Sequence, residues 1–258
     1  MLVCEPFMPP PMDLPPPPLH PELPPEVPIA GEEEIFFRTD DGVEIQALAH
    51  LPREAERAAV LCHPHPLYGG TMHNAIVVIV AKRLRERGQS LAAAGPSVMP
   101  ATIENEPHSV GWLRLNYRGV VKSGGSYGGG KTEVEDVRAA FAEVRRRAPR
   151  AKLSVVGYSF GAGVGYGAAV KDGGIDNIAL VAPSPRMMHG TPLGEFAGPI
   201  QIVAASRDQF CDPEQTTELA QRLGASVKTI EGADHYFVRF RREVASLVAS
   251  FISPELSS

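Results

Sequence analysis

Cysteine, positive charge and long apolar runs are all scarce in this chain, and each shortage narrows what the protein can be. The three cysteines, Cys4, Cys62 and Cys211, lie far apart, which fits neither a disulfide framework nor a metal-binding spacing and favours a reducing compartment. The formal net charge is −5, so we expect no basic surface for nucleic acid. No apolar run approaches the roughly 18 residues of a membrane span.

Features of a targeting signal are also missing from the N-terminal segment. No Lys or Arg precedes Arg38, and the whole sequence has no Asn-x-Ser/Thr acceptor. A secretory signal would begin with a basic segment followed by an apolar one, and a transit peptide would be rich in Arg. We therefore expect a cytoplasmic protein with no membrane partner.

Proline is abundant in one place only. Twelve of the 25 prolines fall between Pro6 and Pro28, and proline fixes φ and removes a backbone donor. Residues 1–33 are therefore expected to form an extended, disordered tail. The tail could make weak contacts with a proline-recognising domain, although a solvated tail is the simpler interpretation. Residues 254–258 are predicted to be a second disordered tail.

From residue 34 onward, predicted strands and helices alternate, beginning with a hairpin around Asp40-Asp41-Gly42. The predicted strands are Glu34–Thr39, Val43–Ala49, Arg57–Cys62, Gly111–Asn116, Lys152–Val156, Asn177–Val181, Ile200–Ala205 and Ser226–Glu231. The predicted helices are Thr71–Arg87, Thr132–Arg147, Phe160–Val170, Pro213–Leu223 and Tyr236–Phe251. Thr132 and Glu135 have the spacing of a capping box.

This order of elements predicts an α/β fold. A hairpin followed by repeated β-α units gives a mostly parallel eight-stranded sheet with an antiparallel N-terminal hairpin and helices on both faces. Residues 34–253 are predicted to form one domain. Residues 89–109 are expected to be a flexible insertion at the sheet edge opposite the strand C-termini, and residues 183–198 are too few for a cap domain.

The main chemical signal is the run Gly157-Tyr158-Ser159-Phe160-Gly161. It follows a predicted strand and precedes a predicted helix, the context of the sharp turn called a nucleophile elbow in α/β hydrolases. Such a turn exposes the serine hydroxyl beside a helix N-terminus, where the backbone N–H of Phe160 can face a developing oxyanion. We predict Ser159 to be a nucleophile.

An acid and a histidine follow Ser159 in the order that this fold requires. Asp208 comes just after the strand Ile200–Ala205, and His235 comes after the last strand. The carboxyl ends of parallel strands meet at one edge of a sheet, so all three side chains should converge there. His235 would take the proton of Ser159, and Asp208 would orient the imidazole. Asp212 is a rival for the role of the acid.

The segment from His63 to Asn74, after the third strand, is the expected source of a second oxyanion donor. Pro64 and Pro66 have no N–H, which leaves the backbone of His65 or Leu67. Tyr68 and Tyr158 are the candidate substrate-binding residues. The histidines of this segment, His63, His65 and His73, have no acidic or thiolate partner at ligand spacing except the adjacent Cys62, so we expect no metal.

The segment His63–Asn74 resembles the His-Pro-His-Pro loop of the small cap-less α/β hydrolases akin to dienelactone hydrolase. The runs Asn116-Tyr117-Arg118-Gly119 and Ser123-Gly124-Gly125 resemble a second block of that family, in which Val121 occupies a usual glycine. The resemblance covers roughly residues 35–252. It implies a triad of Ser159, Asp208 and His235 with esterase activity on small acyl substrates. The Val121 departure is expected to alter the loop near the substrate.

The run Gly125–Thr132 satisfies the phosphate-binding pattern G-x-x-x-x-G-K-[ST]. However, about nine residues separate it from the preceding strand, whereas a phosphate-binding loop leaves its strand directly. We therefore expect a glycine-rich loop before a helix and no nucleotide.

The sequence thus predicts a serine hydrolase that cleaves small carboxylic esters or thioesters through an acyl-enzyme on Ser159, without a cofactor. A catalytically weak hydrolase fold that serves as a binding module is the main alternative, and an NTPase is the third.

Overall fold

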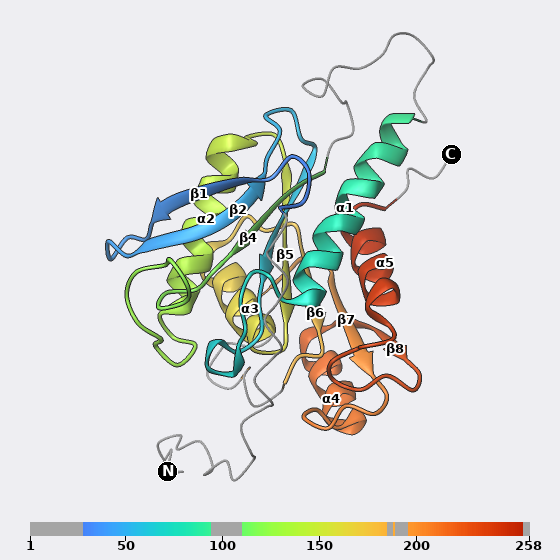
Figure 1. Cartoon of the computed structure of the whole chain (residues 1–258). Helices are drawn as coiled ribbons and strands as arrows, with labels where there is room; N and C mark the ends of the chain where they lie inside the picture. Colours follow the sequence, from blue (N-terminus) through green and yellow to red (C-terminus); the bar gives the residue numbers. More distant parts are fainter. Residues whose placement is uncertain (1–27, 94–109, 185–187, 189–195, 255–258) are drawn as a thin grey trace.

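Eight strands form a single sheet in the computed structural model, which describes residues 28–93, 110–184, 188 and 196–254 (Figure 1). The strands run in the order β1-β2-β4-β3-β5-β6-β7-β8 across the sheet. Their bounds are β1 Glu33–Arg38, β2 Glu44–His50, β3 Arg57–Cys62, β4 Val110–Leu115, β5 Lys152–Tyr158, β6 Asn177–Val181, β7 Ile200–Ala205 and β8 Ser226–Ile230. Strand β2 pairs antiparallel with β1 and β4, and all other neighbours are parallel. The predicted sheet is therefore confirmed.

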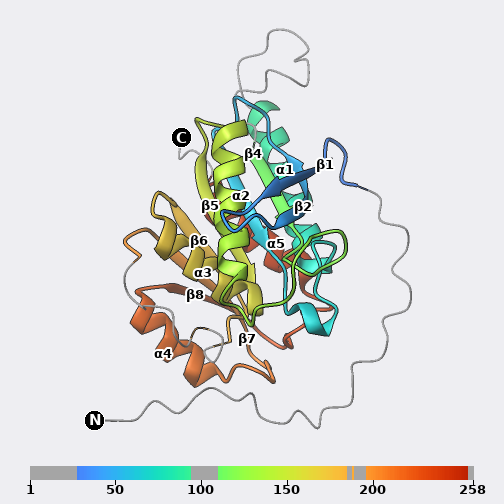
Figure 2. The ribbon, with the colours of Figure 1, turned by 90° about the vertical axis from the view of Figure 1, so that its left-hand side faces the viewer.

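Five α-helices and one short 3-10 helix accompany this sheet in the described part of the chain. They are η1 Pro66–Tyr68, α1 Ala75–Ala93, α2 Glu133–Arg147, α3 Phe160–Asp172, α4 Pro213–Leu223 and α5 Arg241–Ile252. Helices α1 and α5 lie side by side on one face (Figure 1), and α2, α3 and α4 lie on the other (Figure 2). No helix among the described residues is long and apolar enough to cross a membrane.

The alternation of side chains along each central strand supplies a core to both faces. In β3, Ala58, Val60 and Cys62 pack with α2 and α3, whereas Ala59 and Leu61 pack with α1 and α5. All five residues are buried, as expected for a parallel strand covered on both sides. The continuous apolar composition of the strands therefore reflects burial on two faces.

The folded part of the chain begins earlier than predicted. Ile29 is buried in the core, and the Glu32 carboxylate accepts hydrogen bonds from Arg114 and from the indole N–H of Trp112. The predicted tail boundary at residue 33 is thus too late, because one acidic side chain pairs with a buried cation about eighty residues away. Residues 1–27 and 255–258 lie outside the described residues.

Two helices begin later than their periodicity suggested. Helix α1 starts at Ala75, because the side chain of Asn74 caps it by accepting the backbone N–H of Ile76 at 3.0 Å. The helix continues to Ala93, into the predicted insertion, of which residues 94–109 are not described. Helix α5 starts at Arg241, since the residues before it form turns around the buried Phe237, whose φ is +49°.

The predicted capping box at α2 is wrong. Thr132 has helical dihedral angles and makes no side-chain cap bond. Glu135 instead pairs with Arg138 and Lys171 on the helix surface. Glu133, the first residue of this helix, instead accepts hydrogen bonds from backbone N–H groups of the preceding loop.

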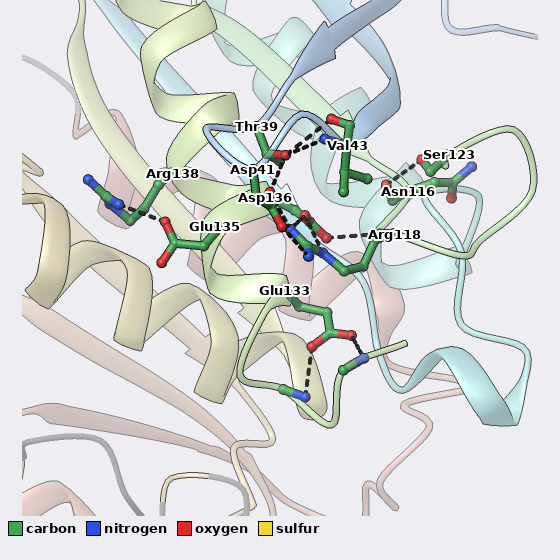
Figure 3. Close-up of polar contacts among 12 residues, drawn as sticks. Thr39, Asp41, Val43, Asn116, Arg118, Ser123, Glu133, Glu135, Asp136 and Arg138 are labelled. Carbon is green, nitrogen blue, oxygen red and sulfur yellow. Dashed lines mark hydrogen bonds and ion pairs between the residues drawn. The ribbon is translucent and has the colours of Figure 1, made fainter. Parts of the chain in front are cut away.

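An ion network centred on the buried Arg118 joins the N-terminal hairpin, the loop after β4 and α2 (Figure 3). The Arg118 guanidinium contacts Asp136 at 2.8 Å and Asp41 at 2.9 Å, and Thr39 in turn donates to Asp41. Arg118 is nearly buried, and these two acids hold its pKa above its usual range. The network fixes the loop that follows β4 against the body of the sheet.

Candidate active site

The serine elbow lies between β5 and α3, as predicted. Ser159 has φ +54° and ψ −115°, a conformation that a residue with a side chain rarely adopts. A Cβ on Gly157 would collide with Gly161 and Ala162, and a Cβ on Gly161 would collide with the carbonyl oxygen of Cys62 at the end of β3. The glycines are therefore needed because the turn brings backbone segments together.

The structure brings together the three side chains predicted from the sequence. Ser159 Oγ lies 3.0 Å from His235 Nε2. On the other side of the ring, His235 Nδ1 lies 3.0 and 2.9 Å from the two carboxylate oxygens of Asp208. The three residues follow β5, β8 and β7, so they meet at the carboxyl edge of the parallel strands.

The hydrogen bonds define the tautomer of His235. The Asp208 carboxylate can only accept, so Nδ1 carries the proton and Nε2 presents a lone pair to the Ser159 hydroxyl. Asp208 is itself held by the backbone N–H groups of Phe210 and Cys211, at 2.8 and 3.1 Å. The side chain of Asp208 is 2% exposed and that of His235 is 7% exposed, so little water competes for these bonds.

The rival acid, Asp212, lies at the start of α4. Its carboxylate accepts the backbone N–H of Glu214 at 2.7 Å and caps the helix. The structure therefore brings Asp208, and not Asp212, to the histidine.

Aromatic side chains surround His235, and sequence reasoning missed most of them. Phe210 and Tyr236 both contact the imidazole edge-on, with ring centroids 4.8 and 5.7 Å away. Both are exposed. Gln209 accepts the backbone N–H of His235 through its side chain at 3.3 Å. These residues adjoin the predicted acid and histidine in sequence, and that adjacency is the signal that could have identified them.

Tyr158 does not fit its predicted role in substrate binding. Its side chain is buried, and its hydroxyl donates to the backbone carbonyl of His235 at 2.9 Å. Burial raises the pKa of Tyr158. The residue precedes Ser159 in an elbow, so its side chain points into the protein and supports the histidine loop. Tyr68, in contrast, is half exposed beside His65.

The loop after β3 contacts the serine elbow through the side chain of His65. The His65 ring contacts the Phe160 ring at 4.8 Å between centroids. The backbone N–H of Leu67 donates to Nδ1 of the same ring at 3.2 Å. Among the described residues, no hydrogen-bond partner is seen for the backbone N–H of His65 or of Phe160.

The other two histidines of this loop have structural partners. His63 is fully buried, which lowers its pKa to about 3, and it accepts the backbone N–H of Tyr117. His73 accepts from the Arg114 guanidinium at 3.2 Å, and burial lowers its pKa to about 4. Within the described ranges, no three His, Cys, Asp or Glu side chains are grouped so as to hold a metal ion.

The glycine-rich loop Gly125–Thr132 already binds a carboxylate of this chain, that of Glu133 at the start of α2. The Glu133 carboxylate accepts the backbone N–H groups of Gly128 and Gly130 at 2.6 and 2.8 Å (Figure 3). Glu133 is 0% exposed. The N–H groups that would hold a nucleotide phosphate in a phosphate-binding loop are therefore used internally, which argues against the NTPase hypothesis.

Val121 lies in a turn next to β2. It has φ +51° and is 68% exposed, and the adjacent Lys122 bonds to Gln46 and Glu34 on the N-terminal hairpin. No hydrogen bond joins Val121 to Ser159 or His235 among the described residues. The expected effect of Val121 on the substrate loop therefore finds no support. The valine at this usual glycine position instead adopts a strained, positive φ in an exposed turn.

Comparisons with known proteins agree with this fold. The model of the dienelactone hydrolase family matches residues 128–251. An uncharacterized protein of Rickettsia prowazekii is 28% identical over 221 residues, which cover 81% of this chain and 84% of the relative. A structure described as an α/β serine hydrolase homologue from Coxiella burnetii matches with a TM-score of 0.70 and 25% identity, covering 87% of this chain and 99% of that one.

A second solved structure, from Xanthomonas campestris, is described as a serine hydrolase without a lid. It matches with a TM-score of 0.68 and 22% identity over 88% of this chain and 98% of its own, and at that identity it supports the fold. The chain is therefore a hydrolase of the α/β-hydrolase fold. Within that class, the predicted resemblance to the dienelactone hydrolase family is confirmed. The match to the family model begins at residue 128, so the resemblance of the His63–Asn74 loop remains a prediction.

Proposed function

We propose that the protein is a serine esterase or thioesterase that forms an acyl-enzyme on Ser159. The observation that carries the proposal is the continuous hydrogen-bond chain from Ser159 Oγ through His235 to the Asp208 carboxylate. Each member has the partner that its role requires, and the buried acid is oriented by two backbone N–H groups. A non-catalytic binding module would have no need of this arrangement.

In the proposed reaction, Ser159 Oγ attacks the carbonyl carbon of the ester while His235 Nε2 removes the hydroxyl proton. The oxyanion of the tetrahedral intermediate faces the backbone N–H groups of Phe160 and His65. Collapse of the intermediate breaks the bond to the alcohol or thiol, which takes the proton from His235. A water molecule, deprotonated by the same imidazole, then attacks the acyl-enzyme, and the acid is released with regeneration of Ser159.

His65 is the better candidate for the second oxyanion donor. The Leu67 N–H already donates to the His65 ring, and a donor so engaged would have to break that bond to serve an oxyanion. The N–H of His65 has no such competitor among the described residues.

The exposed side chains near the site favour an apolar substrate. Phe210 and Tyr236 contact the His235 ring, and Leu67 and Tyr68 lie in the loop after β3. All four side chains are exposed. Apolar surface of this kind binds apolar acyl or alcohol groups. We therefore propose small, accessible carboxylic esters or thioesters with apolar substituents, and a series of p-nitrophenyl esters of increasing acyl length would define the preference.

The test is replacement of the proposed nucleophile. Ser159→Ala should lower kcat for p-nitrophenyl ester hydrolysis by something on the order of 10⁵–10⁶ and abolish labelling by a fluorophosphonate. Ser226→Ala is the matched control, because its hydroxyl donates to the carbonyl of Ile200 at the other end of the strands, away from Ser159. Full activity of Ser159→Ala would refute the nucleophile. An unlabelled, inactive wild-type protein would favour the binding module.

The same assay separates the two candidate acids. Asp208→Ala should lower kcat by a factor on the order of 10⁴, since His235 loses the partner that orients it. Asp212→Ala removes only a helix cap and should leave kcat within about twofold. The reverse ranking would assign the acid to Asp212.

A further inference from the structure

We infer that the glycine-rich loop Gly125–Thr132 positions the oxyanion side of the site, acting through the hydroxyl of Tyr127 and the ring of His65. This inference rests on the proposed function, since it concerns the geometry of the two proposed oxyanion donors. It gives a role to the phosphate-loop-like motif, which hydrolase chemistry alone does not explain.

The His65 ring forms hydrogen bonds through both of its nitrogens. Nδ1 accepts the backbone N–H of Leu67 at 3.2 Å, and Nε2 lies 2.9 Å from the Tyr127 hydroxyl. Because Nδ1 is an acceptor, the neutral ring carries its proton on Nε2 and donates it to Tyr127. The ring therefore has a fixed orientation, with one bond within its own loop and one to the glycine-rich loop.

The glycine-rich loop is itself held by the carboxylate of Glu133. Glu133 accepts the backbone N–H groups of Gly128, which directly follows Tyr127, and of Gly130 (Figure 3). A Cβ on Gly119 would lie 3.0 Å from Cα of Ser126 and 3.1 Å from the backbone nitrogen of Tyr127. Tyr127 is thus fixed on both sides, by a close backbone approach before it and by a buried carboxylate after it.

The side chains of the two donor residues meet in the same cluster. The Phe160 ring lies 4.8 Å from the His65 ring and 6.0 Å from the Tyr127 ring. A Cβ on Gly130 would lie 3.3 Å from the Phe160 ring. The relative placement of the His65 and Phe160 backbones therefore depends on contacts that the glycine-rich loop supplies. Donors that face an oxyanion act mainly in the transition state, so this positioning should affect kcat more than KM.

The test is Tyr127→Phe, which keeps the ring and removes only the hydroxyl. We expect kcat for ester hydrolysis to fall about 10-fold with KM within twofold. The affinity for a boronic acid, which forms a tetrahedral anionic adduct with a serine, should fall by a similar factor. The matched control is Tyr117→Phe, because Tyr117 also packs against the Phe160 ring but its hydroxyl lies beside the buried thiol of Cys62 and makes no hydrogen bond to His65 among the described residues. This control should change kcat by less than twofold.

A double-mutant cycle tests the path through His65. An Asn at position 65 can still accept a backbone N–H two residues ahead but is too short to reach Tyr127. His65→Asn should therefore resemble Tyr127→Phe, and the double variant should lose no more kcat than either single variant. Thermal unfolding of each variant separates this effect from loss of folded protein.

The outcomes distinguish this inference from the proposed function. If Tyr127→Phe retains wild-type kcat and boronic acid affinity while Ser159→Ala is inactive, the positioning role is wrong and the esterase proposal stands. Additive losses in the double variant would also overturn the path through His65. If Ser159→Ala keeps full activity, the proposed function itself is wrong. A selective loss of kcat in Tyr127→Phe and His65→Asn, without additivity, supports the inference.

Discussion

At the scale of single residues, Val121 and Ser159 share a left-handed backbone conformation but differ in what it does. Ser159 lies in the elbow, where the turn presents its hydroxyl to His235. Val121 lies in an exposed turn at φ +51°, and no hydrogen bond among the described residues joins it to Ser159 or His235. A branched side chain in this region costs about 1–2 kcal/mol, and at Val121 nothing in the chemistry requires that strain.

Val121→Gly should therefore stabilise the protein. Relief of the left-handed penalty is offset in part by the extra chain entropy of glycine, about 0.5–1 kcal/mol, so we expect a net gain of about 0.5–1 kcal/mol in the free energy of unfolding. Denaturant titration measures this gain. Val121→Ala keeps the strained φ and should show little gain, and a Val121→Gly variant no more stable than wild type would show that the turn is unstrained.

At the scale of elements, the start of α2 depends on a side chain that closes a loop rather than on the predicted capping box. Thr132 and Glu135 have the right spacing, yet Glu133 takes the N–H groups of the preceding glycines. Sequence spacing shows which residues could cap a helix. It does not show which carboxylate the three-dimensional path of the loop brings to the free N–H groups.

Glu133→Gln should destabilise the protein by about 1.5 kcal/mol, because a neutral amide replaces a charged acceptor for two buried N–H groups. Chemical denaturation tests this expectation. The matched control is Glu135→Gln, whose partly exposed ion pairs with Arg138 and Lys171 should contribute about 0.5 kcal/mol or less. Equal effects of the two substitutions would contradict the role of Glu133.

At the scale of the whole molecule, the buried pair of Glu32 and Arg114 attaches the segment before β1 to the middle of the sheet. Their side chains are 0% and 2% exposed, and the closest nitrogen–oxygen distance is 2.6 Å. Glu32→Gln should cost about 3–5 kcal/mol at neutral pH, because it leaves the Arg114 charge buried without its counter-ion. The neighbouring Glu33, which is exposed and pairs with Arg147, provides the control: Glu33→Gln should change stability by less than about 0.5 kcal/mol.

The contribution of Glu32 should depend on pH in a defined direction. Burial by itself raises the pKa of Glu32, but the hydrogen bonds and charge of Arg114 outweigh it, so the pKa lies below its ordinary value of 4.5. A lowered pKa means stabilisation that is fully present above the unfolded value and is lost as the pH falls through the folded value. The difference in unfolding free energy between wild type and Glu32→Gln should stay constant from pH 6 to 8 and shrink below about pH 4.5. A difference that grew on acidification would contradict this sign.

The sequence by itself determined the order of strands and helices, the elbow at Ser159 and the positions of Asp208 and His235. These features depend on local patterns: apolar runs bounded by glycine, and polar residues just after strand ends. The topology rule that parallel strands share a carboxyl edge then predicted that the three would converge. Helix starts and caps were less predictable, because several residues near Thr71, Thr132 and Tyr236 could begin a helix equally well.

Only the tertiary structure decided contacts between segments that are distant in the chain. It paired Glu32 with Arg114, turned Tyr158 inward onto the His235 loop and joined His65 to Tyr127. Each of these contacts depends on the packing of a whole layer and on the burial of a polar group that must find a partner. No local pattern in the sequence carries that information, since the partner is chosen by proximity in space and by the cost of leaving a buried group unpaired.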